Sequence, residues 1–197
     1  MTEFKISKRQ QEIIEAAGII LTTSGVHGLT TKNLAAEMQF SESALYRHFK
    51  NKSQIIETML TYLKCNMDTR LQEVIVKNNT AKENFRAMFT SQFKFFNNNP
   101  HFVVAVFSDG LMEESQEINS VIKKIMAVKY KHLMKIITKG KQQGIFNQSI
   151  DNEQLIHLVM GSFRLLMFKW RIDNFKFDIH KQGQKVTETL LTLMSPA

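Results

Sequence analysis

Between Gly28 and Lys52, two short helical patterns follow one another, each with its own start signal, eleven residues apart. Thr30 precedes the first pattern and Ser41 precedes the second. Both are favoured N-caps, because their hydroxyl oxygen accepts a hydrogen bond from a free N–H group of the helix. An apolar residue stands before each cap and another stands four positions into each helix, which is the spacing of a hydrophobic staple. This arrangement predicts a helix-turn-helix.

The second of these helices, expected over residues 42–49, has two unlike sides. At about 100° per residue, Leu45 and Phe49 fall on one side and polar residues fall on the other. The polar side carries Glu42, Ser43, Tyr46 and Arg47. A helix of this kind fits the major groove of DNA, which is about 12 Å wide, so we interpret it as a recognition helix.

Two further start signals flank this motif. Ser7 with Gln10 predicts a capping box at the start of the first helix, and Asn51 with Gln54 predicts one for a helix that begins at Lys52. The free N–H groups and the dipole of that first turn favour a phosphate beside Lys52. We therefore expect the helix from Lys52 to contact the DNA backbone.

The rest of the chain also follows helical patterns, and no strand pattern competes. Start signals are Thr80 with Glu83, Asn99 followed by Pro100, and Asp151 with Gln154, and Gly144 predicts the end of a long helix from about Gln116. We predict an all-α chain with an N-terminal three-helix helix-turn-helix domain, residues 1–51. A C-terminal helical domain, residues 52–197, follows, and its first helix links the two.

Composition and charge narrow the class of protein. Of 197 residues, 43% are hydrophobic and two are proline, which suits a chain with a sizeable core. Cys65 is the single cysteine, and no N-terminal apolar run resembles a signal peptide or a membrane span, so we expect a cytoplasmic protein without membrane association. The net charge of +8 favours nucleic acid, yet residues 1–52 hold seven Lys/Arg against five Asp/Glu, only +2.

The N-terminal motif resembles the DNA-binding domain of TetR-family (tetracycline-repressor-like) transcriptional regulators. The resemblance rests on TTKNLAAEM and SESALYRHFKNK, and most specifically on LYRHF followed by Lys52. It implies a sequence-specific transcriptional regulator, a ligand-responsive repressor that binds a palindromic double-stranded DNA operator as a homodimer. The sequence departs from the family pattern at Gln39, where the turn commonly carries glycine, and at Glu42, where many relatives carry a basic residue.

The resemblance also implies roles for single residues. The candidate phosphate contacts are Thr31, Tyr46, His48 and Lys52, and the candidate base readers are Glu42, Ser43, Ala44 and Arg47. For His48, which falls toward the packed side, space filling is the alternative. For Glu42, the acid suits either the positive end of the helix or the N4 group of cytosine. A left-handed backbone at Gln39 would cost on the order of 1 kcal/mol.

Phenylalanine repeats on one broad face of the helix after Thr80, and methionines on later helices can meet it. Such an interior can surround an apolar ligand or form an ordinary core. The resemblance implies a small, apolar effector in the C-terminal domain. The candidate pocket residues are Phe85, Phe89, Phe93, Phe107, Met126, Tyr130, Phe163 and Met167. Asp109, Glu113 and Glu114 could attract a cation, and Arg86 or Arg164 an anion, although charged residues are mostly solvated.

The helix expected from Leu155 to Ile172 is apolar on two sides and must therefore be covered twice. One side can pack on its own domain and the other on a second copy, with Gly161 allowing close approach. The candidate dimer residues are His157, Gly161, Arg164 and Phe168, with Val186, Leu190 and Leu193 of the last helix.

Two other classes of function remain to be weighed. An enzyme has no support, because no HExxH, Gly-rich phosphate loop or GxSxG motif occurs and the six histidines are scattered. We expect no catalytic residues, no cofactor and no metal site. The alternative function is a helix-turn-helix-derived adaptor that acts mainly through protein partners.

Overall fold

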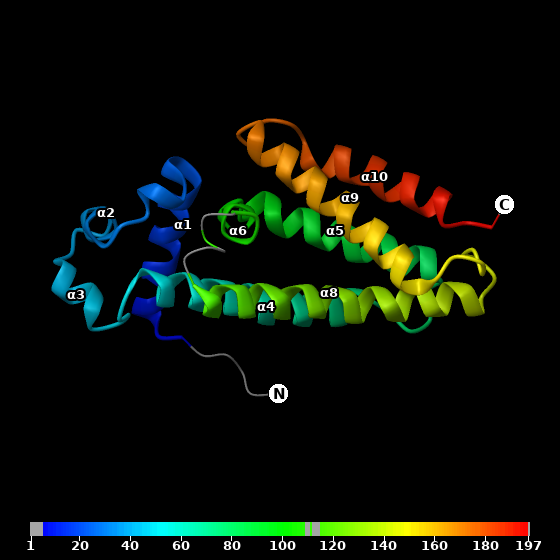
Figure 1. The fold of residues 1–197 in the computed structure, drawn as a ribbon, viewed down its shortest axis with the longest axis horizontal. Helices are drawn as coiled ribbons and strands as arrows, with labels where there is room; N and C mark the ends of the chain where they lie inside the picture. Colours follow the sequence, from blue (N-terminus) through cyan, green and yellow to red (C-terminus); the bar gives the residue numbers. More distant parts are fainter. Residues whose placement is uncertain (1–5, 109–110, 112–114, 197) are drawn as a thin grey trace. The chain divides into compact units, whose positions relative to one another are not determined.

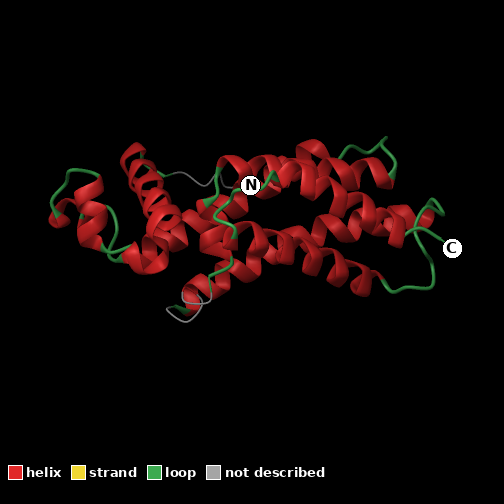
Figure 2. Ribbon diagram, turned by 90° about the horizontal axis from the view of Figure 1, so that it is seen from above, coloured by secondary structure: helices red, strands yellow, loops and turns green. Residues whose placement is uncertain are grey.

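The computed structural model describes residues 6–108, 111 and 115–196, and these residues form helices and loops without a strand (Figures 1 and 2). The predicted all-α class is confirmed. The helices are α1 (Lys8–Gly28), α2 (Thr31–Glu37), α3 (Glu42–Tyr46), α4 (Lys52–Val74), α5 (Ala81–Asn98), α6 (His101–Val106), α8 (Gln116–Gln142), α9 (Asn152–Ile172) and α10 (Ile179–Leu193). None of the helices in the described part of the chain combines the length and the apolar character needed to span a membrane.

The chain divides into two compact units. Unit 1 comprises Met1–Asn66 and Pro100–Ile125, and unit 2 comprises Met67–Asn99 and Met126–Ala197. Unit 1 contains α1, α2, α3 and α6, unit 2 contains α5, α9 and α10, and both α4 and α8 contribute to each unit. The domain boundary between residues 51 and 52 stays a prediction.

Side-chain caps start the helices of unit 1 where the sequence predicts. Ser7 and Gln10 form the capping box of α1, with N–H···O distances of 3.2 and 3.0 Å. Thr30 starts α2 and Ser41 starts α3, and each hydroxyl oxygen accepts a hydrogen bond from the N–H three residues on, at 3.1 and 3.3 Å. Each cap satisfies a backbone donor that the helix itself leaves free.

The α3 helix ends at Tyr46 and is therefore shorter than the predicted range of 42–49. The carbonyl of Leu45 accepts hydrogen bonds from the N–H groups of both His48 and Phe49, at 2.9 and 3.0 Å. The first of these bonds spans three residues, which is the tighter spacing with which helices often end. Leu45 and Phe49 are nevertheless both buried, as predicted.

Two predicted capping boxes form only in half. Asn51 Oδ1 accepts a hydrogen bond from Gln54 N–H at 2.8 Å, but Gln54 Oε1 accepts one from Lys50 N–H instead of from Asn51. Asp151 Oδ1 accepts from Glu153 N–H at 2.7 Å, one residue earlier than predicted. Both capping residues therefore accept a hydrogen bond from the first turn. The return bond of Gln54 and the N–H group bound by Asp151 differ from the prediction, because a side chain in a first turn reaches more than one backbone group.

The prediction that Asn99 caps a helix is wrong. The α6 helix begins at His101 with Pro100 in the N-cap position, and no side chain caps it. The Asn99 amide donates a hydrogen bond to the carbonyl of Phe95 at 2.9 Å. Because α5 ends at residue 98, Asn99 serves a free carbonyl of that helix rather than the start of the next one.

In unit 1, α1 packs against α6. The His101 ring lies directly on Gly18, where an added Cβ would come within 2.9 Å of His101 Cγ. Burial lowers the pKa of the His101 imidazole to about 4, and the carboxylate of Glu15 opposes this shift only in part. Any side chain at position 18 would therefore push α6 away from α1.

In unit 2, α10 packs against α5 and α9 (Figure 1). The predicted capping box of Thr80 and Glu83 starts α5. Gly183 of α10 lies against the Phe93 ring, so that an added Cβ would come within 2.5 Å of it. The long α8 helix ends at Gln142, and Gly144 follows with a φ of 66°, as predicted for a helix stop.

The turn between α2 and α3 contains Gln39 with a φ of 54°. This is the left-handed conformation whose cost to a residue other than glycine was considered above. Phe40, the next residue, is half-buried, and the Arg9 guanidinium lies 4.9 Å from the centre of its ring.

Gln39→Gly should stabilise the protein by about 1 kcal/mol, because glycine adopts this backbone conformation without a Cβ clash. Urea-induced unfolding measures the change, and Gln11→Gly within α1 is the control, which should destabilise by about the same amount. Equal destabilisation by both substitutions would show that the turn is not strained.

Candidate DNA-binding and ligand-binding sites

The polar side of α3 lies at the surface. Glu42, Ser43, Tyr46 and Arg47 are exposed, and Ala44 is half-buried. Tyr46 is 52% exposed, although a tyrosine usually buries much of its apolar surface. Since the opposite side of α3 is buried, the outward residues are available to a partner.

Glu42 holds α3 to α2. Its Oε2 atom accepts a hydrogen bond from the Thr31 hydroxyl at 2.9 Å, which joins the first turns of the two helices. The carboxylate also lies in the first turn of α3, where the helix dipole favours negative charge. Both observations support the structural role of Glu42, and the DNA contacts of Glu42 and Thr31 stay predictions.

His48 and Lys52 lie at the ends of neighbouring helices. His48 is half-buried, and its carbonyl accepts a hydrogen bond from the Gln10 side chain at 3.4 Å, which ties the end of α3 to α1. Lys52 is the first residue of α4, directly after the capping residue Asn51. Its position in a first turn is the one that the sequence predicts.

Five of the predicted pocket residues gather in the core of unit 2. They are Phe85, Phe89, Phe93, Phe163 and Met167, and all are buried. The Phe163 ring of α9 is central, because its centre lies 5.8 Å from that of Phe89, 5.7 Å from that of Phe93 and 6.1 Å from that of Phe96. We call Phe89, Phe93, Phe96 and Phe163 the phenylalanine cluster.

The other three predicted pocket residues lie elsewhere. Met126 and Tyr130 are exposed, at 49% and 37%, because Lys129 and Leu133 occupy the inward side of α8. Phe107 follows α6 and belongs to unit 1. The structure therefore does not place Met126 and Tyr130 in the interior that the sequence suggested for them.

Two polar residues in the core of unit 2 were missed by the sequence analysis. Lys129 is 8% exposed, and its Nζ atom lies 3.1 Å from the centre of the Phe163 ring. Gln92, between Phe89 and Phe96 on α5, is fully buried, and both polar atoms of its amide lack a hydrogen-bond partner. Their burial could have been predicted from their position, since each residue falls on the apolar stripe of its helix.

Burial lowers the pKa of the Lys129 ammonium to about 7. Among the described residues, no carboxylate offsets this effect, and the face of the Phe163 ring is the group that the cation meets. A cation over an aromatic face is stabilised, but less than by a carboxylate with hydrogen bonds. Unit 2 thus carries an uncompensated positive group in an apolar interior.

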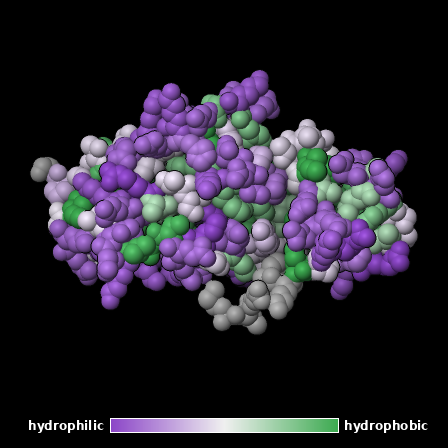
Figure 3. All heavy atoms as spheres, turned by 180° about the vertical axis from the view of Figure 1, so that it is seen from behind, coloured by the Kyte–Doolittle hydropathy of each residue, from purple (hydrophilic) through white to green (hydrophobic). Residues whose placement is uncertain are grey.

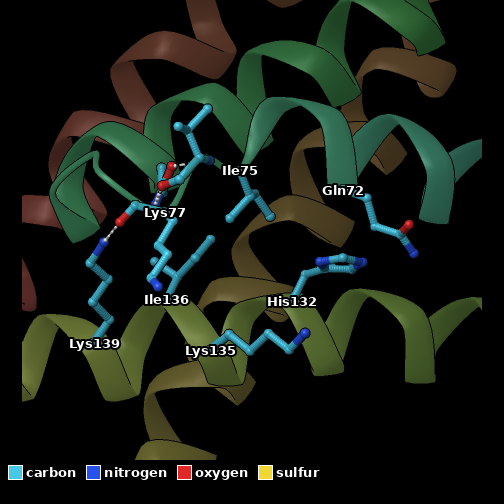
Figure 4. Close-up of a pocket in the computed structure, with 9 residues that line it drawn as sticks. Gln72, Ile75, Lys77, His132, Lys135, Ile136 and Lys139 are labelled. Carbon is cyan, nitrogen blue, oxygen red and sulfur yellow. Dashed lines mark hydrogen bonds between the residues drawn. The ribbon is translucent and has the colours of Figure 1, made fainter.

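A separate groove of about 430 Å³ lies between the end of α4 and the second half of α8 (Figure 4). Its basic side chains are Lys77, Lys135, Lys139 and His132. The Lys139 ammonium donates hydrogen bonds to the carbonyls of Lys77 and Asn79, and so it fixes the loop before α5. Since Lys77 and Lys135 are exposed, we assign this groove no ligand.

Hydrophobic side chains reach the surface in several places, some of them visible in Figure 3. On α9, the exposed apolar residues are Leu158, Leu165, Phe168 and Ile172, at 46% exposure or more. With Gly161 they repeat every three or four residues, which is the spacing of a helix–helix seam. The predicted dimer residues His157, Gly161, Arg164 and Phe168 are all exposed. Leu158, Leu165 and Ile172 were not among the predicted interface residues, although their helical spacing can be read from the sequence.

The predicted residues of α10 border the same face. A groove of about 340 Å³ runs between α9 and α10, and it is lined by Leu165, Leu166, Val186, Leu190 and Leu193, among others. Leu193 is 69% exposed, whereas Leu190 is buried. At the Gly161 position, an added Cβ would meet no atom within 4 Å, so the helix is open to close approach there.

Of the charged alternatives, Arg86 and Arg164 lie among the described residues. Arg86 donates two hydrogen bonds to Glu188, at 2.7 and 2.8 Å, and the Arg164 side chain is exposed. Asp109, Glu113 and Glu114 lie outside the described residues. Within the described ranges, no three His, Cys, Asp or Glu side chains come together as metal ligands would.

The sequence matches two family models that together span most of the chain. Residues 13–59 match the model described as bacterial regulatory proteins of the tetR family, and residues 57–193 match the model of the C-terminal region of YsiA-like proteins, TetR_C_4. The chain belongs to the TetR family. It is accordingly a DNA-binding transcriptional regulator, as the resemblance of the helix-turn-helix implied.

Individual relatives are distant but span nearly the whole chain. The nucleoid occlusion factor SlmA of Photobacterium profundum is 24% identical over 88% of this chain and 89% of that protein. The fatty acid metabolism regulator protein of Bacillus subtilis is 22% identical over 93% of this chain and 94% of that protein. The structure of Bacillus subtilis FadR in complex with stearoyl-CoA shares the fold, with a TM-score of 0.78 at 20% identity over 92% and 97% of the chains.

Lys129→Met should remove the rise in stability that Lys129 causes at alkaline pH. The pKa of Lys129 is about 7 in the folded protein and close to 10.5 when unfolded, so the unfolded state binds more protons between these values. Wild-type stability should therefore rise from pH 7 toward pH 10, relative to the variant, by on the order of 3 kcal/mol. Urea unfolding at several pH values measures this, with Lys135→Met as the exposed control. Parallel curves for wild type and Lys129→Met would contradict the assignment.

Proposed function

We propose that the protein is a ligand-responsive repressor that binds a palindromic DNA operator as a homodimer in the cytoplasm, without enzymatic activity. The observation that carries this proposal is the two-sided exposure of α3. Leu45 on its apolar side is buried, and Tyr46 and Arg47 on its polar side are exposed. A helix held in this way can enter the major groove without losing its packing.

Within this proposal, the residues of the head divide into two kinds. Glu42, Ser43, Ala44 and Arg47 read base edges, and Thr31, Tyr46, His48 and Lys52 contact phosphates. Arg47 is the strongest candidate reader, because an exposed arginine can donate two hydrogen bonds to guanine. Lys52 lies in the first turn of α4, where the N–H groups of the helix support a phosphate contact.

A homodimer supplies the recognition length that one head lacks. One short helix reads few base pairs, whereas two heads about 34 Å apart read two half-sites. We assign the dimer contact to the exposed seam of α9, Leu158 to Ile172, with His157, Gly161, Arg164 and Phe168, and to Val186, Leu190 and Leu193 of α10. A second copy covers this face because a twofold interface pairs a seam with itself.

The effector in this proposal is a small, mainly apolar molecule held in the core of unit 2. The buried phenylalanine cluster supports it, as does the solved neighbour with stearoyl-CoA, a ligand with a hydrocarbon chain. An effector that binds one conformation of the dimer better than the other shifts DNA affinity, and couplings of this kind are typically about 1 to 3 kcal/mol.

Arg47→Ala and Lys52→Ala should weaken DNA binding in different ways. Losing the arginine should cost about 1 to 3 kcal/mol on the operator and relax specificity at one base pair, while losing the lysine should weaken binding to all sequences and lower the salt slope by about one. Fluorescence anisotropy with upstream DNA and a scrambled duplex, over a salt series, measures both. An equal loss from Arg47→Ala on every operator variant would exclude Arg47 as a reader.

Leu165→Glu should dissociate the dimer, because it places a charge without a partner in the middle of the α9 seam. We expect the dimer dissociation constant to rise by about 100-fold or more, as measured by analytical ultracentrifugation. Ile19→Glu is the matched control, since Ile19 is equally exposed, at 52%, but lies on α1. If both variants stay dimeric, the interface lies elsewhere.

The adaptor alternative has one observation in its favour, the similarity to proteins named nucleoid occlusion factors. In that case, the helix-turn-helix would act mainly through a protein partner. Co-purification of a defined protein partner, together with equal binding of upstream and scrambled DNA, would favour the adaptor over the repressor.

A further inference from the structure

The core of unit 2 contains a buried amide without a hydrogen-bond partner and a buried ammonium group that meets an aromatic ring face. Gln92 is fully buried, and neither its Nε2 nor its Oε1 atom has a partner. Lys129 is almost fully buried, and no carboxylate among the described residues lies beside it. Buried polar groups in folded proteins are nearly always satisfied, so the unpaired Gln92 amide and the buried Lys129 ammonium in one core need an explanation.

Lys129 contacts the phenylalanine cluster, and Gln92 lies on the stretch of α5 that carries three of its rings. The Lys129 ammonium lies over the Phe163 ring at 3.1 Å from its centre. Gln92 precedes Phe93 on α5 and lies between Phe89 and Phe96, and all three of these rings are neighbours of Phe163. The ring cluster therefore meets a cation from α8, and the helix that carries most of its rings also buries an unpaired amide.

A packing role alone does not account for these residue types. Leucine or methionine would fill either position without burying a polar group, and a buried amide or ammonium without a partner destabilises the folded state. An unpaired polar group can, in contrast, contribute to ligand binding where the ligand supplies its missing hydrogen-bond partner. The amide then gains its hydrogen bonds, and the ammonium gains a counter-ion, only when the ligand is bound.

We propose that Lys129 and Gln92 form the polar end of the effector site and that the effector is an amphipathic carboxylate, an apolar chain or ring system that ends in one carboxylate group. This inference rests on the proposed function, because it names the ligand class of the site in unit 2. The carboxylate oxygens accept hydrogen bonds from Lys129 Nζ and Gln92 Nε2. The phenylalanine cluster contacts the apolar part.

The charges of the site favour a carboxylate over a neutral group. The interior offers one amine without a counter-ion, and an anionic ligand supplies that counter-ion and holds the amine in its protonated form inside a region of low dielectric constant. A charge-assisted hydrogen bond is stronger than a neutral one, and the surrounding rings exclude the water that would weaken it. A neutral ester presents the same chain but cannot neutralise Lys129.

Isothermal titration calorimetry with dodecanoate and with its methyl ester tests this directly on the full-length protein. We expect Lys129→Met to weaken dodecanoate binding by about 10- to 100-fold and to change methyl ester binding less than about twofold. Gln92→Leu should weaken both probes, because the amide can donate to either oxygen. Lys135→Met, an exposed lysine on the same helix, should change neither affinity.

Proton uptake provides a second readout that a purely structural role would not produce. Carboxylate binding holds Lys129 in its charged form, so at pH 8 the wild type should take up nearly one proton with each dodecanoate, and Lys129→Met should take up none. Titrations in two buffers with different ionisation enthalpies measure the proton number. Equal proton numbers in the two proteins would overturn the proposal.

The remaining outcomes separate this inference from the proposed function. Operator binding by the wild type without any probe is measured in the same preparations. Absence of operator binding would overturn the proposed function. Operator binding together with dodecanoate affinity that is independent of Lys129 would overturn only the carboxylate site. Dodecanoyl-CoA is the third probe, and tight binding of it that Lys129→Met leaves unchanged would assign the site to an acyl thioester and refute the free carboxylate.

Discussion

The burial of Leu45 and Phe49 is the interaction on which the DNA-binding head depends. A helix of five residues has too few internal hydrogen bonds to be stable alone. Packing supplies what those bonds cannot, because Leu45 is 2% exposed and Phe49 is 3% exposed. The Ser41 cap and the hydrogen bond from Thr31 to Glu42 then fix the direction in which α3 leaves the turn. The inward residues therefore hold α3 in place, and its outward residues take no part in that packing.

Features set by neighbouring residues could be predicted from the sequence. The caps at Ser7, Thr30 and Ser41 and the helix stop at Gly144 follow from local backbone chemistry, and the structure shows each of them. The left-handed turn at Gln39 is also a local feature, and it occupies the position where relatives commonly carry glycine.

Features that depend on competition between partners were harder to predict. Asn99 can serve either the end of α5 or the start of α6, and only the observed chain path decides for α5. On α8, apolar Met126 and Tyr130 looked inward from composition alone, whereas a lysine takes the inward position. A long-chain cation on an apolar stripe is easily discounted, because its hydrocarbon stem suits both surface and core.

The α9 helix carries residues of both the proposed ligand site and the proposed dimer interface, on opposite faces. Phe163 and Met167 point into the core of unit 2, while Leu165 and Phe168, one or two residues away, form part of the exposed seam. A helix of 21 residues is stiff, so a rotation that makes room for a ligand beside Phe163 also turns the seam. Packed interfaces favour discrete arrangements over gradual deformation. A ligand that binds Lys129 and contacts Phe163 therefore acts on the same rigid helix that a second copy would contact.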